Sequence, residues 1–80
     1  MPEGLDVYQQ AIWHAGTGHW EKAHQLIQDL PDKKAAHIHA YLHREEGDQW
    51  NAEYWYAKAG QPVPNTSLRE EWEALVKTYC

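Results

Sequence analysis

The chain of 80 residues has room for one small domain, and its seven Lys and Arg against twelve Asp and Glu give a formal charge of −5 at pH 7. This acidic balance, without any basic run, argues against a nucleic-acid-binding surface. No uncharged stretch approaches the roughly 20 apolar residues of a membrane-spanning helix. The N-terminal run MPEGLD lacks the features of a signal peptide, and the single Cys80 cannot form an internal disulfide. We therefore expect a cytoplasmic protein that binds neither membranes nor nucleic acids.

Turn-forming residues divide the chain into five segments of helical length. The turns lie at residues 16–18, 31–32, 47–48 and 60–65. The predicted helices, in chain order, cover residues 5–15, 19–30, 33–45, 48–59 and 67–79. No segment alternates polar and apolar residues with a period of two, so we expect no sheet. The sequence predicts an all-α fold with a single domain over residues 1–80.

The ends of three predicted helices are supported by specific residues. Pro31 disfavours a helical conformation at Leu30 and so ends the second helix. Gly60 is placed to end the fourth helix in a left-handed cap. Ser67 and Glu70 have the spacing of a capping box at the start of the fifth helix. The apolar stripe of this helix consists of Leu68, Trp72, Leu75, Val76 and Tyr79.

An internal repeat relates the first two predicted helices to the next two. A shift of 29 residues aligns four identical pairs: Ala11 with Ala40, His14 with His43, Gly18 with Gly47, and Ala23 with Ala52. Small alanines allow two helices to approach closely, and a glycine permits the tight turn between them. Each half is therefore predicted to form one helix hairpin.

The second hairpin resembles a tetratricopeptide repeat. The residues that carry this resemblance are Ala40, Gly47, Ala52, Tyr56, Ala59 and Pro64. In the first hairpin the matching residues are Ala11, Gly18, Trp20 and Ala23, whereas Ile27 and Leu30 replace the aromatic residue and the last alanine. The period of 29 residues is shorter than the usual repeat of about 34. The resemblance implies two stacked hairpins, with the fifth helix as a capping helix that shields the last apolar face.

The stretches HAYLHREEGD and NAEYWYAKAG also resemble a family of small bacterial proteins without an assigned activity. This second resemblance implies no function.

The tetratricopeptide resemblance implies a concave surface formed by the first helix of each hairpin. Its expected residues are Tyr8, Ile12, Ala15, His37, Tyr41 and Arg44. Such a surface would bind a peptide or protein partner with an apolar anchor and a carboxylate, because Arg44 can pair with a carboxylate. No cofactor is needed for this function. The alternative is that these residues form an ordinary half-exposed helix face.

Histidines provide a second functional hypothesis. His39 and His43 are spaced i, i+4, which places two imidazoles on one helix face, and the repeat puts His14 at the position equivalent to His43. Together they could bind a divalent transition metal or another small ligand. Because the chain has neither an HExxH motif nor a cysteine pair, the sequence favours histidines that are packed and hydrogen-bonded between helices.

Nothing in the sequence resembles a nucleophile elbow, a phosphate-binding loop or a dinucleotide fingerprint. The sequence therefore favours an interaction module over an enzyme. An enzymatic activity is considered only under the alternative hypothesis of a histidine-lined metal or small-ligand site. A third hypothesis is self-association through exposed members of the five Trp and five Tyr residues.

Overall fold

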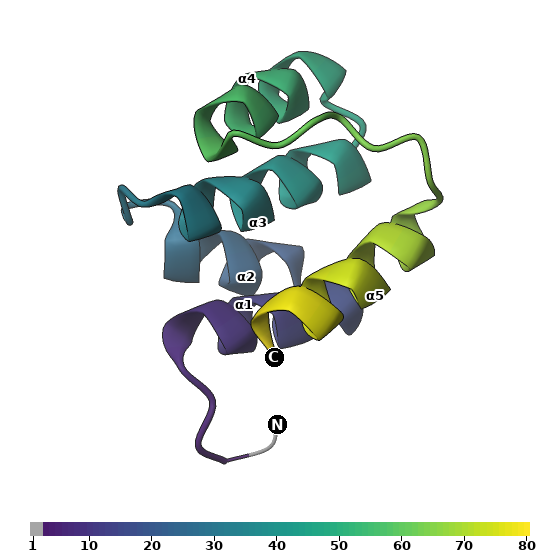
Figure 1. Ribbon diagram of the computed structural model, residues 1–80. Coiled ribbons are helices and arrows are strands. Elements are labelled where there is room, and N and C mark those ends of the chain that lie inside the picture. Colours follow the sequence, from purple (N-terminus) through teal and green to yellow (C-terminus); the bar gives the residue numbers. More distant parts are fainter. Residues whose placement is uncertain (1–2) are drawn as a thin grey trace.

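The computed structural model describes residues 3–80, which form five α-helices and no strand (Figure 1). The helices are α1 (Val7–Gly16), α2 (Trp20–Ile27), α3 (Lys33–Glu45), α4 (Gln49–Ala59) and α5 (Leu68–Tyr79). The predicted all-α fold of five helices is confirmed. The largest difference in bounds is at the end of α2, which stops at Ile27 because the Leu30 amide bonds the Ile27 carbonyl in a tighter turn before Pro31.

Polar side chains cap four of the five helices formed by residues 3–80. Ser67 and Glu70 form the predicted capping box at the start of α5. Asp6 begins α1, Asp32 begins α3 and Asp48 begins α4, each accepting a hydrogen bond from a backbone amide of the first turn. These caps accept hydrogen bonds from amides that have no partner within the helix. The start of each of these four helices is therefore specified by residues close to it in the sequence.

The helices pair as two hairpins, α1 with α2 and α3 with α4, and α3 is the central element (Figure 1). It contacts every other helix. Gly18 and Gly47, which the repeat relates, both make their turns with positive φ angles of 81° and 86°. The repeated alanines at positions 11, 23, 40 and 52 are all fully buried. Tyr56 packs with Ala40 and Ala52 in a second, smaller cluster. Larger apolar side chains fill the main core around Ala11 and Ala23: Ile12, Ile27, Ile38, Leu42 and Leu75.

The fifth helix packs against α1 and α3, and in Figure 1 it lies in front of α1 and below α3. Leu75 enters the core, and the Trp72 indole N–H donates to the Ile12 carbonyl at 2.8 Å. Gly16 is required by this contact, because a Cβ at that position would lie 2.3 Å from the Trp72 ring. The resemblance placed α5 on the last hairpin as a cap for α4. That placement is wrong, since α5 packs instead on the face that the resemblance assigned to a partner.

The outer face of α4 consequently stays uncovered. Trp50 is 88% exposed and Tyr54 is 52% exposed. None of the helices in residues 3–80 combines the length and apolar character needed to cross a bilayer.

Candidate metal centre

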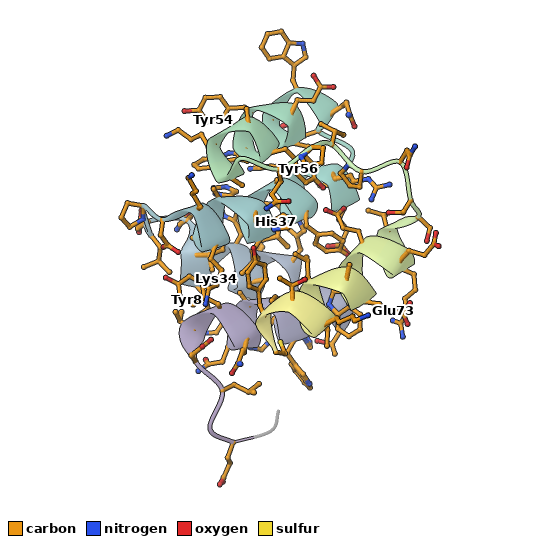
Figure 2. The ribbon with its side chains drawn as sticks, in the orientation of Figure 1. Tyr8, Lys34, His37, Tyr54, Tyr56 and Glu73 are labelled. Atoms are coloured by element: carbon orange, nitrogen blue, oxygen red, sulfur yellow. The ribbon has the colours of Figure 1, made fainter. Side chains whose placement is uncertain are left out.

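The residues predicted to line a concave binding surface are engaged within the protein. Ile12 and Tyr41 are buried in the core. The Tyr8 hydroxyl donates to Asp32 Oδ1 at 2.9 Å. His37 Nδ1 is hydrogen-bonded to the Tyr79 hydroxyl of α5 at 2.9 Å, and Figure 2 shows His37 and Tyr8 on the side of the molecule where α5 lies. These side chains are therefore engaged within the chain, Tyr8 by Asp32 and His37 by Tyr79 of α5, and do not line a free surface.

Arg44 is also part of this internal network. Its Nη1 donates to Glu71 Oε1 at 2.8 Å, and its Nη2 donates to the Thr66 carbonyl. Glu71 is buried and accepts a second hydrogen bond, from the Tyr56 hydroxyl, on Oε2. We expected a partner to supply a carboxylate and an apolar anchor, and α5 supplies both within the same chain through Glu71 and Leu75. Arg44 is therefore an architectural residue.

The histidines converge in a different combination from the one predicted. His39 and His43 of α3 lie together as expected, but the third member is His24 of α2, and the ring nitrogens of the three lie within 4.8 Å of one another. His14 does not belong to this group. Its ring contacts Trp13 and His19, and its Nδ1 is buried with no hydrogen-bond partner among residues 3–80.

The repeat alignment does not identify His24, because it predicts His14, the residue equivalent to His43, as the third histidine. His14 lies in the last turn of α1, whereas α2 presents His24 to α3. The sequence did carry a signal: His24 lies four residues after Trp20 and three before Ile27, on the apolar face of α2.

The centre of the cluster is a close contact between two imidazoles. His24 Nε2 and His39 Nε2 are 2.9 Å apart. The rings of His39 and His43 stack with centroids 4.7 Å apart and an interplanar angle of 23°. His39 is 5% exposed and His43 is 8% exposed, so these nitrogens are largely removed from bulk water.

Two tryptophans flank the cluster. Trp20 of α2 stacks on His24 with centroids 4.8 Å apart, and its indole N–H donates to the Leu42 carbonyl at 2.7 Å. Trp55 of α4 stacks on His39 with centroids 3.9 Å apart. The indoles hold the two rings in orientation and exclude water from their faces.

A carboxylate lies on the outer side of the cluster. His43 Nδ1 and Glu46 Oε1 are 2.7 Å apart, a distance typical of a charge-assisted hydrogen bond. Asp48 is close to both groups, but it caps α4 by accepting from the backbone and side chain of Asn51. Glu46 is therefore the carboxylate that His43 contacts directly.

The cluster favours the neutral form of His24 and His39. Burial and the neighbouring imidazoles of His24 and His43 lower the pKa of His39 to about 4. Burial and the proximity of His43 lower the pKa of His24 as well. At pH 7 these rings carry lone pairs that can bind a metal ion, which is the form that coordination requires.

The nitrogen spacing is compatible with coordination. Zinc–nitrogen bonds of 2.0–2.1 Å in a tetrahedral site separate ligand nitrogens by about 3.3 Å. His24 Nε2 and His39 Nε2 are 2.9 Å apart and all three nitrogens lie within 4.8 Å of one another, so the rings would have to shift for one ion to bind all three. Without an ion, one Nε2–H donates to the other Nε2.

Comparisons of the chain with protein-family models, with curated proteins and with solved structures found no match. The resemblance to tetratricopeptide repeats therefore stays a prediction.

Proposed function

We propose that this protein binds a divalent transition metal ion through His24, His39 and His43. The observation that carries the proposal is the convergence of three imidazole nitrogens from two helices within 4.8 Å, with two of the rings almost completely buried. Imidazole ligands suit zinc, copper and nickel ions, whereas magnesium and calcium prefer oxygen. The three imidazole nitrogens thus favour a divalent transition metal over magnesium or calcium.

The competing explanation is that these are ordinary core histidines that bind no metal. It accounts for their burial, but less well for the contact between two imidazoles. A core histidine needs a hydrogen-bond partner for each buried nitrogen, and carbonyls or hydroxyls usually supply it. Here two imidazoles use each other as partners, and a ring nitrogen of the third histidine lies within 4.8 Å of them. A metal ion would satisfy all three nitrogens at once. Within residues 3–80 no fourth His, Cys or carboxylate joins the group, so water or a small ligand would complete a tetrahedral site.

Isothermal titration of the metal-free protein with Zn²⁺, Ni²⁺ and Cu²⁺ tests the proposal. We expect one ion per chain, and a stabilisation of about 2.7 kcal/mol when the free ion is at 100 times its Kd. Because Trp20 and Trp55 stack on two of the ligands, Cu²⁺ should also quench tryptophan fluorescence at the same stoichiometry.

The matched variants are His24→Ala and His19→Ala. His24 is only partly buried, so its loss should remove one-to-one binding while leaving the fold intact. His19 is exposed and lies outside the cluster, so its replacement should leave binding unchanged. Equal affinities for both variants and the unaltered protein would contradict the proposal, because adventitious binding to surface histidines would then explain the titration.

Partner binding is the second candidate function. The surface that supports it is the exposed side of α4, not the predicted surface on α1 and α3. Trp50, Tyr54 and Lys58 follow one another at intervals of four residues along the exposed side of α4. A hollow of about 440 Å³ beside Lys58 is lined by Trp55 and by the turn between α2 and α3. Exposed tryptophans often dominate binding energies at protein interfaces.

The Trp50→Ser variant tests this second candidate. It should bind less of any protein that the unaltered chain captures, or lose self-association in sedimentation experiments. An exposed glutamate on α5 offers a control, because Glu73→Gln alters a surface far from α4. Identical behaviour of Trp50→Ser and the unaltered protein would exclude this face.

A further inference from the structure

The outer nitrogen of His43 distinguishes this residue from the other two histidines of the cluster. Its Nδ1 lies 2.7 Å from Glu46 Oε1. An ionised carboxylate can only accept in this bond, so His43 Nδ1 carries a hydrogen, and in the neutral ring the lone pair is then on Nε2. Among the described residues 3–80, neither His24 nor His39 has a hydrogen bond to a carboxylate.

We infer that Glu46 is a positioning residue for the metal centre, which fixes the tautomer and orientation of His43 so that its Nε2 is ready to coordinate. The inference rests on the proposed function of the cluster. In many metal sites a carboxylate accepts a hydrogen bond from the ring nitrogen of a histidine that does not bind the metal. This hydrogen bond raises the basicity of the nitrogen that does bind it. The negative charge of the carboxylate also offsets part of the charge of the ion.

The local structure explains how Glu46 is held in place. It follows the last residue of α3 and is three residues beyond His43, so the two side chains lie on one face of the helix end. Its backbone amide still donates to the Leu42 carbonyl at 3.1 Å, which continues the helical geometry through this residue. The carboxylate is therefore placed by the helix and not by a loose turn.

A purely electrostatic role for nearby acidic residues is the competing explanation. Asp48 tests it, because its carboxylate is within 4.8 Å of a His43 ring nitrogen and of the Glu46 carboxylate but accepts from Asn51 instead. Asp48→Asn removes one negative charge at this distance and retains a side chain that caps helices well. It is a matched control for Glu46→Gln, which removes the same charge but keeps a hydrogen-bond acceptor.

The experiment has two readouts on the full chain. The first is the ¹⁵N spectrum of the His43 ring in metal-free protein, which identifies the tautomer. The second is Zn²⁺ affinity by competition with a chelator of known affinity. Glu46→Ala should lose the Nδ1–H tautomer preference and bind zinc about 10 to 100-fold more weakly. Glu46→Gln should keep the tautomer and lose less affinity, and Asp48→Asn should match the unaltered protein in both readouts.

The inference is overturned if Glu46→Ala keeps both the tautomer and the affinity, or if Asp48→Asn weakens binding as much as Glu46→Gln does. If the unaltered protein binds no zinc, the proposed function fails, and the tautomer readout still decides whether Glu46 orients His43. Should Glu46→Ala not fold, the comparison of Glu46→Gln with Asp48→Asn decides the question.

Discussion

Replacement of Arg44 by methionine should destabilise the fold strongly. The variant keeps much of the side-chain length but leaves the buried carboxylate of Glu71 with only the Tyr56 hydroxyl as a partner. Removing one member of a buried ion pair typically costs about 3 to 5 kcal/mol, because the remaining charge stays desolvated and uncompensated. A domain of 80 residues has a free energy of unfolding of about 4 to 12 kcal/mol. The substitution should therefore remove a large part of the total.

Thermal and urea denaturation followed by circular dichroism measure this effect. For a domain of this size the expected cost corresponds to a fall in Tm of about 12 to 40 °C. A double variant, Arg44→Met with Glu71→Met, should recover much of the loss, because two apolar side chains leave no buried charge unpaired. Glu73→Gln is the control, since its pair with Arg69 is exposed and should contribute at most about 1 kcal/mol.

An Arg44→Met variant with the stability of the unaltered protein would refute this reasoning. It would mean that the pair between α3 and α5 is solvated and that α5 can leave the face it covers. The original expectation of an accessible Arg44 that binds a partner's carboxylate would then regain support.

Three further predictions follow from the packing and the histidines. Gly16→Ala should cost about 1 to 3 kcal/mol in urea denaturation, because the new methyl group displaces the Trp72 ring; unchanged stability would mean that this contact is loose. Ending the chain at residue 66 should expose the core face of α1 and α3, so the fragment should aggregate or lose its cooperative transition; a monodisperse, cooperatively folding fragment would show that α5 is peripheral. In metal-free protein the pKa of His39 is about 4 in the folded state, below the ordinary value of about 6.5, so the unfolded chain binds more protons between these values. The contribution of neutral His39 to the free energy of unfolding should be fully present above about pH 6.5 and should be lost as the pH drops towards 4. In a His39→Gln variant, the urea midpoint should therefore fall less steeply over this pH range.

The positions of the helices could be predicted because they depend on local signals. The capping box of α5 and the glycine turns each specify a start or an end within a few residues of sequence. The docking site of α5 could not be predicted in the same way. Its apolar stripe shows that one face is buried, but the face of α1 and α3 and the outer face of α4 were both apolar enough to receive it. The docking site depends on contacts between residues far apart in the sequence, such as the pair between Arg44 and Glu71, which are 27 residues apart, and the packing of Leu75 in the core.

The histidine cluster was predictable to the extent that its members share a helix. The spacing of His39 and His43 is visible in the sequence, but the third histidine comes from another helix and its place depends on how the hairpins pack. The repeat suggested His14 because it relates positions within each hairpin, whereas the cluster forms across the contact between α2 and α3. Only the packing shows that His24 faces His39.

The central helix explains why both functional hypotheses arose from the same segment. Two rows of polar residues run along α3, one at positions 37, 41 and 44 and the other at positions 39, 43 and 46, and the offset of two residues places them about 200° apart. Because α3 contacts every other helix, each row meets a packed surface and its polar groups need partners. The first row finds them in α5. The second row ends on Glu46 but begins with His39, whose partner is another imidazole of the same kind. The hydrogen bond between His24 and His39 satisfies only their two Nε2 atoms, and a ring nitrogen of His43 lies within 4.8 Å of them. Under the proposed function, a metal ion would therefore lie on the α2 side of α3, where it could engage all three imidazoles at once.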